Sequence, residues 1–154
     1  MKKLENDAMR LGNQLCFAVY STAHALNRVY KSLLEPLGLT YPQYLVMLTL
    51  WEKDDVSVKE IGARLYLDSG TLTPLLKRLE QSGLITRQRD AVDERHVRIS
   101  LTPQGRHLRV KAKTVPYGLL CATGGSLEEL VALRDDLTAL RDRLHADADA
   151  ADEE

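Results

Sequence analysis

The chain contains little cysteine and no long apolar segment. Only two of its 154 residues are cysteine, and apolar runs such as YLVMLTLW fall far short of the roughly 20 residues of a membrane-spanning helix. The first residues, MKKLENDAMR, carry two lysines but lack the apolar segment of a secretory signal. We therefore expect a cytoplasmic protein with no membrane partner. In that compartment the cysteines are redox-active, metal-binding or inert rather than a permanent disulfide.

A metal-binding pattern is also absent. The four histidines are scattered and show no ligand spacing with either cysteine, whereas zinc sites are built from closely spaced pairs of such residues; they are His24, His96, His107 and His145. The sequence also has no internal repeat and no low-complexity core. We expect no metal and no cofactor.

Charge is distributed unevenly along the chain. The net charge is only −1, but residues 128–154 hold ten acidic and three basic side chains, which leaves twelve acidic and eighteen basic ones in residues 1–127. A basic body fits a polyanionic partner, although this signal alone is weak. The terminal HADADAADEE has almost nothing to bury, so we expect a frayed acidic tail over residues 146–154.

Helical periodicity dominates the first part of the sequence. Apolar residues recur every three or four positions and predict one long amphipathic helix from about Leu4 to Glu35. Pro36 and Gly38 end it. The stretch YPQYLVMLTLWE predicts a second helix that begins at Tyr41.

Two shorter helices joined by a tight turn are expected next. Ser57 and Glu60 form the capping-box pattern that opens the first of them. Gly83 is a fitting residue just after the end of the second. Pro74 is tolerable in that helix only if it lies in the first turn or so. Three residues are candidate N-caps for it: Asp68, Ser69 and Thr71.

The pattern then changes to β-structure and back. The segments LITRQRD and HVRISLT alternate or carry β-branched residues, and the polar AVDER separates them, which predicts a β-hairpin with a charged tip. Thr102 and Pro103 open another helix, which Pro116 should kink or interrupt. A second capping box, Ser126 with Glu129, opens the last helix.

These elements together predict a mainly α protein with a small β-wing, that is, a winged helix-turn-helix between long N- and C-terminal helices. Hydroxyl side chains near the start of the second short helix suit base edges and phosphates, and basic side chains at its far end and in the wing suit phosphates. An acidic wing residue can orient a neighbouring arginine toward a narrow minor groove. The candidate DNA contacts are Ser69, Thr71, Thr73, Lys77, Arg78, Arg87, Asp93 and Arg95.

The stretch GTLTPLLKRLEQSGLITRQRDAVDERHVRISLTPQG resembles the recognition helix and wing of the MarR family of transcription regulators. The wing signature DxRxxxxxLT is present as Asp93, Arg95, Leu101 and Thr102. This resemblance implies a homodimeric repressor, not an enzyme, that binds pseudo-palindromic double-stranded operator DNA. It also implies a single domain over residues 1–154, with dimerisation helices at 1–37 and 103–145 and a DNA-binding region at 40–102.

Within that family, LCFAVYSTAHALNRVYKSLLEPLGLTYPQYLVMLTLWE is similar to the organic hydroperoxide sensors. In that group the peroxide oxidises a cysteine on the first helix, and two tyrosines, 14 and 25 residues downstream, hydrogen-bond its sulfur. Those offsets fall on Tyr30 and Tyr41 from Cys16. The position of Cys121 resembles the two-cysteine subtype, which implies an intersubunit disulfide between Cys16 and Cys121 after oxidation.

The residue types suit this chemistry. A thiolate attacks peroxide, an ordinary cysteine with a pKa of about 8.5 is only slightly ionised at neutral pH, and phenolic donors favour the thiolate. Three alternatives stay open. Cys16 is an inert core residue, or a small aromatic ligand releases the DNA by non-covalent binding, or the chain is a thiol peroxidase. The last lacks an arginine or threonine beside Cys16 and leaves the DNA-binding half without purpose.

Overall fold

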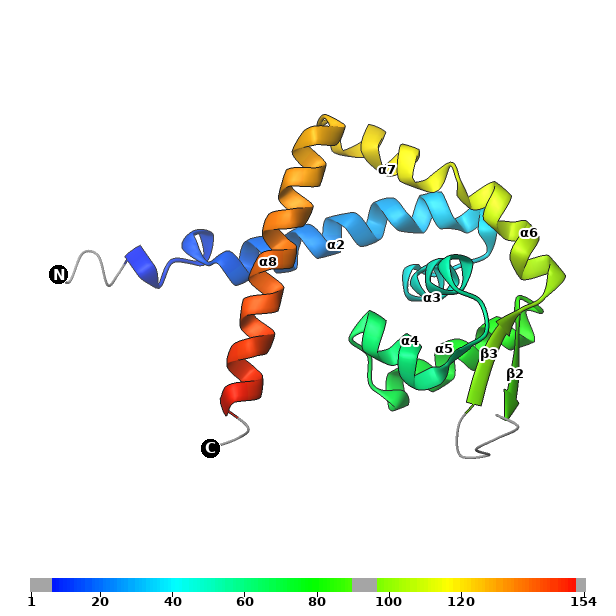
Figure 1. Ribbon diagram of the computed structural model, residues 1–154. Helices are drawn as coiled ribbons and strands as arrows, with labels where there is room; N and C mark the ends of the chain where they lie inside the picture. The colour runs from blue at the N-terminus through cyan, green and yellow to red at the C-terminus, as the bar shows by residue number, and fades with distance from the viewer. Residues whose placement is uncertain (1–6, 90–96, 152–154) are drawn as a thin grey trace. The chain divides into compact units, whose positions relative to one another are not determined.

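The computed structural model describes residues 7–89 and 97–151, with side chains up to residue 147 (Figure 1). The chain forms two compact units, Met1–Val115 and Pro116–Glu154. The first unit contains the winged helix-turn-helix, and the second contains most of α7 together with α8. None of the described helices combines the length and the apolar character needed to cross a membrane.

The first long helix is shorter than the sequence predicts. Helix α2 spans Leu15–Leu34, and before it Arg10 and Gln14 have extended backbone angles on either side of a single 3-10 turn, η1 (Leu11–Asn13). The prediction of one continuous helix from about Leu4 is therefore wrong over residues 9–14. The apolar spacing continues through this break, but glycine and asparagine within η1 are weak helix formers.

The end of α2 and the three helices after it follow the prediction. The 3-10 turn η2 (Glu35–Leu37) ends at Gly38, whose φ of +66° favours glycine. Helix α3 spans Tyr41–Glu52. Helices α4 (Val58–Leu65) and α5 (Ser69–Gln81) form the helix-turn-helix. The predicted capping box opens α4: the Ser57 hydroxyl accepts the Glu60 N–H at 3.1 Å, and the Glu60 carboxylate accepts the Ser57 N–H at 3.0 Å.

Pro74 does not lie in the first turn of its helix. Asp68 is the N-cap and α5 begins at Ser69, so Pro74 falls in the second turn. Proline has no N–H to donate to the carbonyl of Gly70, four residues earlier, and its ring crowds that carbonyl. The Thr73 hydroxyl donates to the Ser69 carbonyl at 2.7 Å. The helix therefore accommodates the proline while its first turn gains a side-chain hydrogen bond.

The β-sheet has one strand more than the predicted hairpin. Strands β2 (Ile85–Arg89) and β3 (Val97–Leu101) are antiparallel, as predicted, with Ile85 opposite Leu101. A two-residue strand, β1 (Val56–Ser57), pairs with the other edge of β3, which gives the order β1-β3-β2. Two residues are too short to show an alternating pattern. The predicted hairpin tip, with Asp93 and Arg95, lies outside the described residues.

The C-terminal helices are interrupted as expected. Helix α6 spans Pro103–Ala112 and is capped by the Thr102 hydroxyl, which accepts the Gly105 N–H at 3.0 Å. Helix α7 (Val115–Thr123) begins one residue before Pro116. The predicted Ser126–Glu129 capping box opens α8 (Leu127–Ala151). Residues 146–151, which were expected to fray, are therefore part of α8.

The core of the first unit fixes α5 and α6 on one scaffold. Buried side chains from α2, α3, α4, α5 and the sheet meet there, among them Leu34, Met47, Leu50, Ile61, Leu72, Leu76, Leu79 and Ile99. The buried Trp51 indole on α3 donates to the Gly105 carbonyl on α6 at 2.9 Å. The recognition helix, the wing strands and α6 are thus held by the same packed interior.

Candidate DNA-binding surface and thiol site

Helix α5 presents its basic residues away from the core. Leu72, Leu76 and Leu79 are buried, and their spacing defines the inner face of the helix. At 100° per residue, Lys77 and Arg78 fall on the opposite face, and both are exposed. These two predicted phosphate contacts are therefore available on the outside of the helix-turn-helix.

The predicted hydroxyl contacts cluster at the start of α5. Ser69 and Thr71 are exposed, and Thr73 is half-buried. The Asp68 carboxylate accepts the Thr71 N–H at 2.8 Å and the Thr71 hydroxyl at 3.1 Å. The hydrogen bond from the Thr71 N–H is the main cause that holds the pKa of Asp68 below its usual value. The Thr71 proton is thus used within the helix cap, while its oxygen keeps lone pairs for a donor on DNA.

Arg87, the predicted wing contact on β2, is engaged in an ion pair. Its Nε lies 2.7 Å from Oε2 of Glu80 on α5, and the Arg87 side chain is 29% exposed. The pair joins the end of the recognition helix to the first wing strand. Sequence reasoning missed Glu80, because seven residues and a change from helix to strand separate the partners.

A groove of about 620 Å³ lies between α4, α5 and the sheet. Its polar lining includes Lys59, Ser69, Thr73 and Arg87, and Val58 is part of its apolar wall. Three of the predicted DNA-contact residues therefore border one concave surface.

Tyr30 and Tyr41 lie against each other, as is expected if both phenols bind the same sulfur atom. Tyr30 is on α2 and Tyr41 is the first residue of α3, and their ring centroids are 4.2 Å apart. Tyr44 extends the cluster, with its ring centroid 6.2 Å from that of Tyr30. Sequence reasoning did not single out Tyr44. The sequence could have revealed Tyr44, because it lies three residues after Tyr41 and therefore on the same face of the helix.

The environment keeps these phenols neutral. Burial, reinforced by the neighbouring Tyr41 and Tyr44, raises the pKa of Tyr30 to about 12. Burial also raises the pKa of Tyr41, while its hydrogen bond with Tyr30 acts in the opposite direction.

Cys16 and the tyrosine pair are far apart within one chain. Cys16 is the second residue of α2, and Tyr30 lies fourteen positions further along the same helix. At 1.5 Å per residue this separation is about 21 Å, too long for a hydrogen bond. Tyr30 and Tyr41 therefore do not contact the sulfur of their own protomer.

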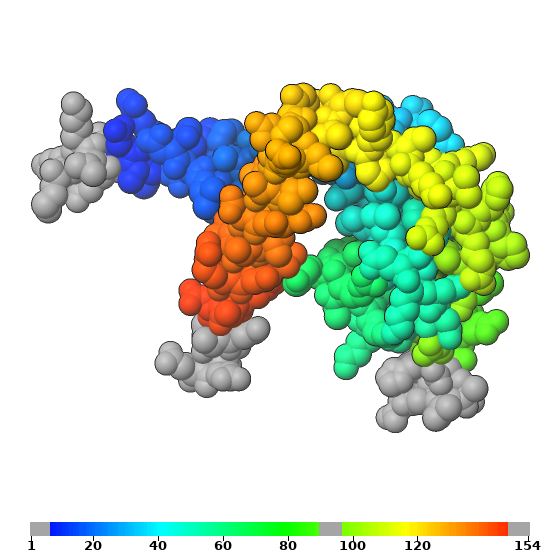
Figure 2. Space-filling view, turned by 45° about the horizontal axis from the view of Figure 1, so that its top comes forward, coloured from blue at the N-terminus to red at the C-terminus, as the bar shows by residue number. Residues whose placement is uncertain are grey.

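Both thiols are exposed. The side chains around Cys16 are exposed as well: Leu15 is 60% and Tyr20 61% exposed, and Figure 2 shows this blue part of the chain at the surface. The alternative that Cys16 is an inert core residue therefore does not hold for the isolated chain. Cys121 lies on α7, in the second unit. Among the described residues no group of histidine, cysteine, aspartate or glutamate side chains is arranged to hold a metal ion.

Comparisons with known proteins identify the family. The protein-family model described as transcriptional regulator SarA/Rot matches residues 28–111. The chain is 57% identical over 143 residues to the HTH-type transcriptional regulator TtmR of Methylorubrum extorquens (strain PA1), which covers 93% of this chain and 73% of that protein. It is 50% identical over 139 residues to the organic hydroperoxide resistance transcriptional regulator of Bacillus subtilis (strain 168), with coverage of 90% and 95%.

Solved structures agree. Reduced AbfR bound to DNA is 37% identical, has a TM-score of 0.74 and covers 92% of this chain and 99% of its own; AbfR is from Staphylococcus epidermidis. Disulfide-formed AbfR has a TM-score of 0.63 at the same identity and covers 91% and 98%. A MarR-family regulator from Rhodococcus sp. RHA1 is 25% identical, with a TM-score of 0.77 and coverage of 86% and 95%. The relatives are regulators rather than enzymes, and the chain belongs to the MarR family of winged-helix transcription regulators, in the group of the organic hydroperoxide resistance regulators.

Proposed function

We propose that this regulator is a homodimeric repressor that releases its operator when an organic hydroperoxide oxidises Cys16, which then forms a disulfide with Cys121 of the partner protomer. The observation that carries the proposal is the packed, neutral pair Tyr30–Tyr41 at the two offsets expected for sulfur-binding phenols. A cytoplasmic location belongs to the same proposal, because the operator is there.

Two uncovered apolar surfaces support a dimer. One is the exposed N-terminal half of α2, which carries Leu15, Phe17, Val19 and Tyr20. The other is a seam on α8 in which leucines alternate at steps of three and four residues: Leu130, Leu133, Leu137, Leu140 and Leu144. That spacing is typical of helices that pack in a coiled coil, and a second copy of the chain offers the matching seam.

Helix length dictates how the sulfur meets the tyrosines. Because a chain cannot bring Cys16 to its own Tyr30, the contact must come from the partner, and in a two-fold dimer it forms twice. Two α2 helices that pair residue 16 with residue 30 of the other must cross near the midpoint of that span. The midpoint is Ala23, which is exposed. The proposal thus puts the two-fold axis close to Ala23.

The proposed chemistry balances without a cofactor. The Cys16 thiolate attacks the terminal oxygen of the hydroperoxide, the O–O bond breaks, and the sulfur becomes a sulfenic acid. The departing alkoxide takes up a proton from water, which balances the proton that Cys16 lost on ionising, and leaves as an alcohol. The thiol of the partner's Cys121 then attacks this sulfur, forms the S–S bond and releases water. The hydroxyls of the partner's Tyr30 and Tyr41 are the proposed donors that stabilise the thiolate before attack.

The relatives make this chemistry plausible for the chain. AbfR has been solved reduced on DNA and also in a disulfide-formed state, and the Bacillus subtilis relative is named for organic hydroperoxide resistance. Both cysteines of the present chain are exposed. Closing a disulfide requires the two Cα atoms to approach within about 4.4–6.8 Å, so a change in the helices that carry them would accompany oxidation.

Operator binding with and without cumene hydroperoxide tests the sensor. The duplex is selected from random-sequence DNA with the reduced protein. Wild type is expected to bind and then release it on oxidation, with a disulfide-linked dimer on non-reducing electrophoresis. Cys16→Ser should bind and stay bound, and Cys121→Ser should lose the linked dimer. Peroxide-induced release of both wild type and Cys16→Ser, or of neither, would reject Cys16 as the sensor.

The dimer geometry has its own test. In a Cys16→Ser/Cys121→Ser background, Ala23→Cys should react with a short bis-maleimide to give a covalent dimer. Arg109→Cys, at an exposed position on α6, is the matched control and should remain uncrosslinked. A crosslinking yield for Ala23→Cys no greater than that of the control would exclude the proposed crossing.

A second candidate function is release by a small aromatic ligand. The groove between α4, α5 and the sheet favours it, because an apolar wall and the Arg87 guanidinium suit an aromatic carboxylate beside the recognition helix. In that case Cys16→Ser would still release DNA when the ligand is added. Salicylate is a suitable probe, with Arg87→Gln as the variant that should lose the response.

A further inference from the structure

Two consecutive aspartates between α3 and β1 are each held by several hydrogen bonds. Asp54 Oδ1 accepts the N–H of Leu101 at 2.8 Å, and its Oδ2 pairs with the Arg106 guanidinium. Leu101 is the last residue of β3 and Arg106 lies in the first turns of α6. Asp54 therefore ties the end of a wing strand to the following helix and to the end of α3.

Asp55 holds the same strand further along. Its Oδ1 and Oδ2 accept from Nε and Nη2 of Arg98 at 2.8 and 2.9 Å, a bidentate pair, and Oδ1 also accepts the Ser100 hydroxyl at 3.2 Å. The hydrogen bond from Arg98 is the first cause that lowers the pKa of Asp55. Asp55 adopts a φ of +56°, a region that aspartate tolerates better than most residues. The sharp turn aims the carboxylate at β3.

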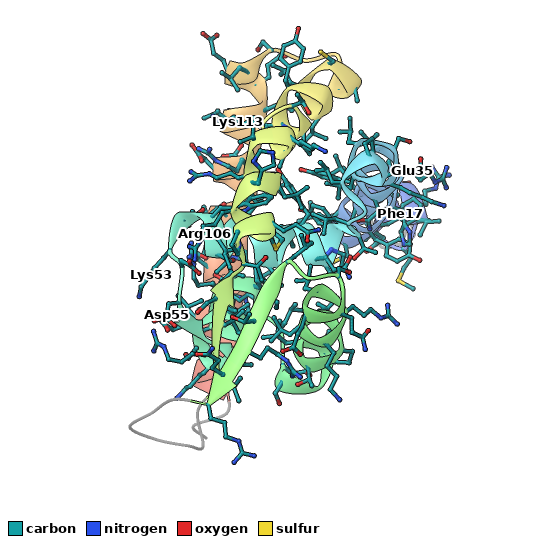
Figure 3. The ribbon with its side chains drawn as sticks, turned by 90° about the vertical axis from the view of Figure 1, so that its right-hand side faces the viewer. Phe17, Glu35, Lys53, Asp55, Arg106 and Lys113 are labelled. Carbon is teal, nitrogen blue, oxygen red and sulfur yellow. The ribbon has the colours of Figure 1, made fainter. Side chains whose placement is uncertain are left out.

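Together these contacts form a clamp, which we define as Asp54 and Asp55 with their partners Arg98, Ser100, Leu101 and Arg106. Figure 3 shows Lys53, Asp55 and Arg106 along the same side of the domain. The clamp grips three of the five residues of β3, the central strand between β1 and β2. It is the polar counterpart of the apolar packing beneath the sheet, and it sets the direction in which the two wing strands leave the domain.

We propose that Asp54 and Asp55 are positioning residues for operator binding, which fix the wing strands relative to α3 and α6 without touching the DNA. DNA-contacting groups must be held within about 0.5 Å of their productive position, and a two-stranded hairpin alone is too weak to hold itself. A small rotation at the base of β3 would carry every residue further along the hairpin out of reach of the duplex.

The negative charge of Asp55 allows an experiment to distinguish a positioning role from a direct effect of charge on DNA affinity. Asp55→Asn removes one negative charge, and that change alone should strengthen binding to the phosphate backbone. If Asp55 has a positioning role, Asp55→Asn should instead weaken operator binding, because a neutral amide no longer forms the bidentate ion pair with Arg98. Arg98→Lys keeps the positive charge but loses the planar fork, so it should weaken binding for the same reason.

The experiment compares Asp54→Asn, Asp55→Asn and Arg98→Lys with a matched control, Glu52→Gln. Glu52 is exposed and pairs with Arg64 on α4, so the control removes the same charge two or three residues away without touching β3. Affinity for the selected operator is measured by fluorescence anisotropy on the reduced protein, over a range of salt concentrations. Melting temperature is measured on every variant. Peroxide is absent throughout, so the outcome does not depend on the proposed sensing chemistry.

The clamp variants should bind about ten-fold more weakly, the loss expected for one well-placed contact. In Asp55→Asn the slope of log affinity against log salt should stay unchanged, and the melting temperature should shift little because the Asp55–Arg98 ion pair is exposed and such pairs stabilise weakly. Glu52→Gln should bind as well as wild type or better. The proposal is overturned if Asp55→Asn matches Glu52→Gln in affinity. It is equally overturned if the loss of affinity simply tracks a fall in melting temperature.

Discussion

Gly105 offers a direct test of how tightly α6 is seated on the helix-turn-helix. A Cβ at this position would lie 2.0 Å from the Leu84 carbonyl oxygen and 3.1 Å from its carbon. Both atoms belong to the backbone, so no side-chain rotation relieves the contact. Gly105→Ala would therefore push the start of α6 away from the turn that precedes β2.

The expected cost follows from what that displacement breaks. Three of the hydrogen bonds at the start of α6 involve Thr102 or Gly105: Thr102 N–H to the Leu84 carbonyl at 3.1 Å, the Thr102 hydroxyl to the Gly83 carbonyl at 2.6 Å, and the Trp51 indole to the Gly105 carbonyl at 2.9 Å. At about 1 kcal/mol each, their loss costs about 3 kcal/mol. Replacing a helical glycine with alanine returns about 1 kcal/mol. With the added strain of overpacking, about 1–3 kcal/mol, the net destabilisation is about 3–5 kcal/mol.

Urea and thermal unfolding at matched protein concentration measure this change, because the proposed dimerisation would make apparent stability depend on concentration. The melting temperature of Gly105→Ala should fall by about 6–20 °C. Gly12→Ala is the control, since a Cβ there meets nothing within 4 Å. A Gly105→Ala protein as stable as wild type would refute the close packing of α6 against Leu84, and with it the shared scaffold of α6 and the wing.

Three further predictions follow from single side chains. Because burial raises the pKa of Tyr30 to about 12, the unfolding free energy should fall as pH rises from about 10 to 12, and Tyr30→Phe should reduce both this fall and the late phenolate absorbance, of which Tyr41 and Tyr44 with their raised pKa keep a part. Because Asp68 caps α5 and its pKa lies below the usual value, the stability that its charge contributes should be lost as pH falls through that lowered pKa; Asp68→Ala should lower the urea midpoint more than Asp68→Asn, and the difference between wild type and Asp68→Asn should vanish in acid. Glu80→Gln should free Arg87 for a phosphate and steepen the salt dependence of operator binding by about one unit, and an unchanged slope would mean that Arg87 serves only the fold.

Local signals predicted most of the elements because each depends on nearby residues. The capping boxes at Ser57 and Ser126 and the break near Pro116 rest on contacts within a few positions. The break between Arg10 and Gln14 escaped prediction because apolar spacing continues through it. Strand β1 escaped because two residues show no periodicity, and it exists only through its pairing with β3.

The sequence predicted some of the candidate sites more completely than others. The exposed basic face of α5 follows from helical spacing, since the buried leucines fix which side turns outward. The clamp was invisible, because Asp55 and Arg98 are 43 residues apart and nothing local to either announces the pair. The two tyrosines were identified through family offsets alone. Their contact with each other, and their distance from Cys16 along α2, come from the structure.

In the proposed dimer, the length of α2 makes thiol oxidation depend on dimerisation. If the sulfur of one protomer is served by phenols of the other, as about 21 Å of helix within one chain requires, an isolated protomer has neither a tuned thiol nor a paired recognition helix. A substitution that separates the protomers, such as Leu137→Asp in the α8 seam, should therefore abolish operator binding and selective oxidation of Cys16 together. Cys16→Ser should remove only the second. A Leu137→Asp protein that is monomeric in solution yet still oxidised at Cys16 as fast as wild type would show that the tyrosines of the partner have no part in the reaction.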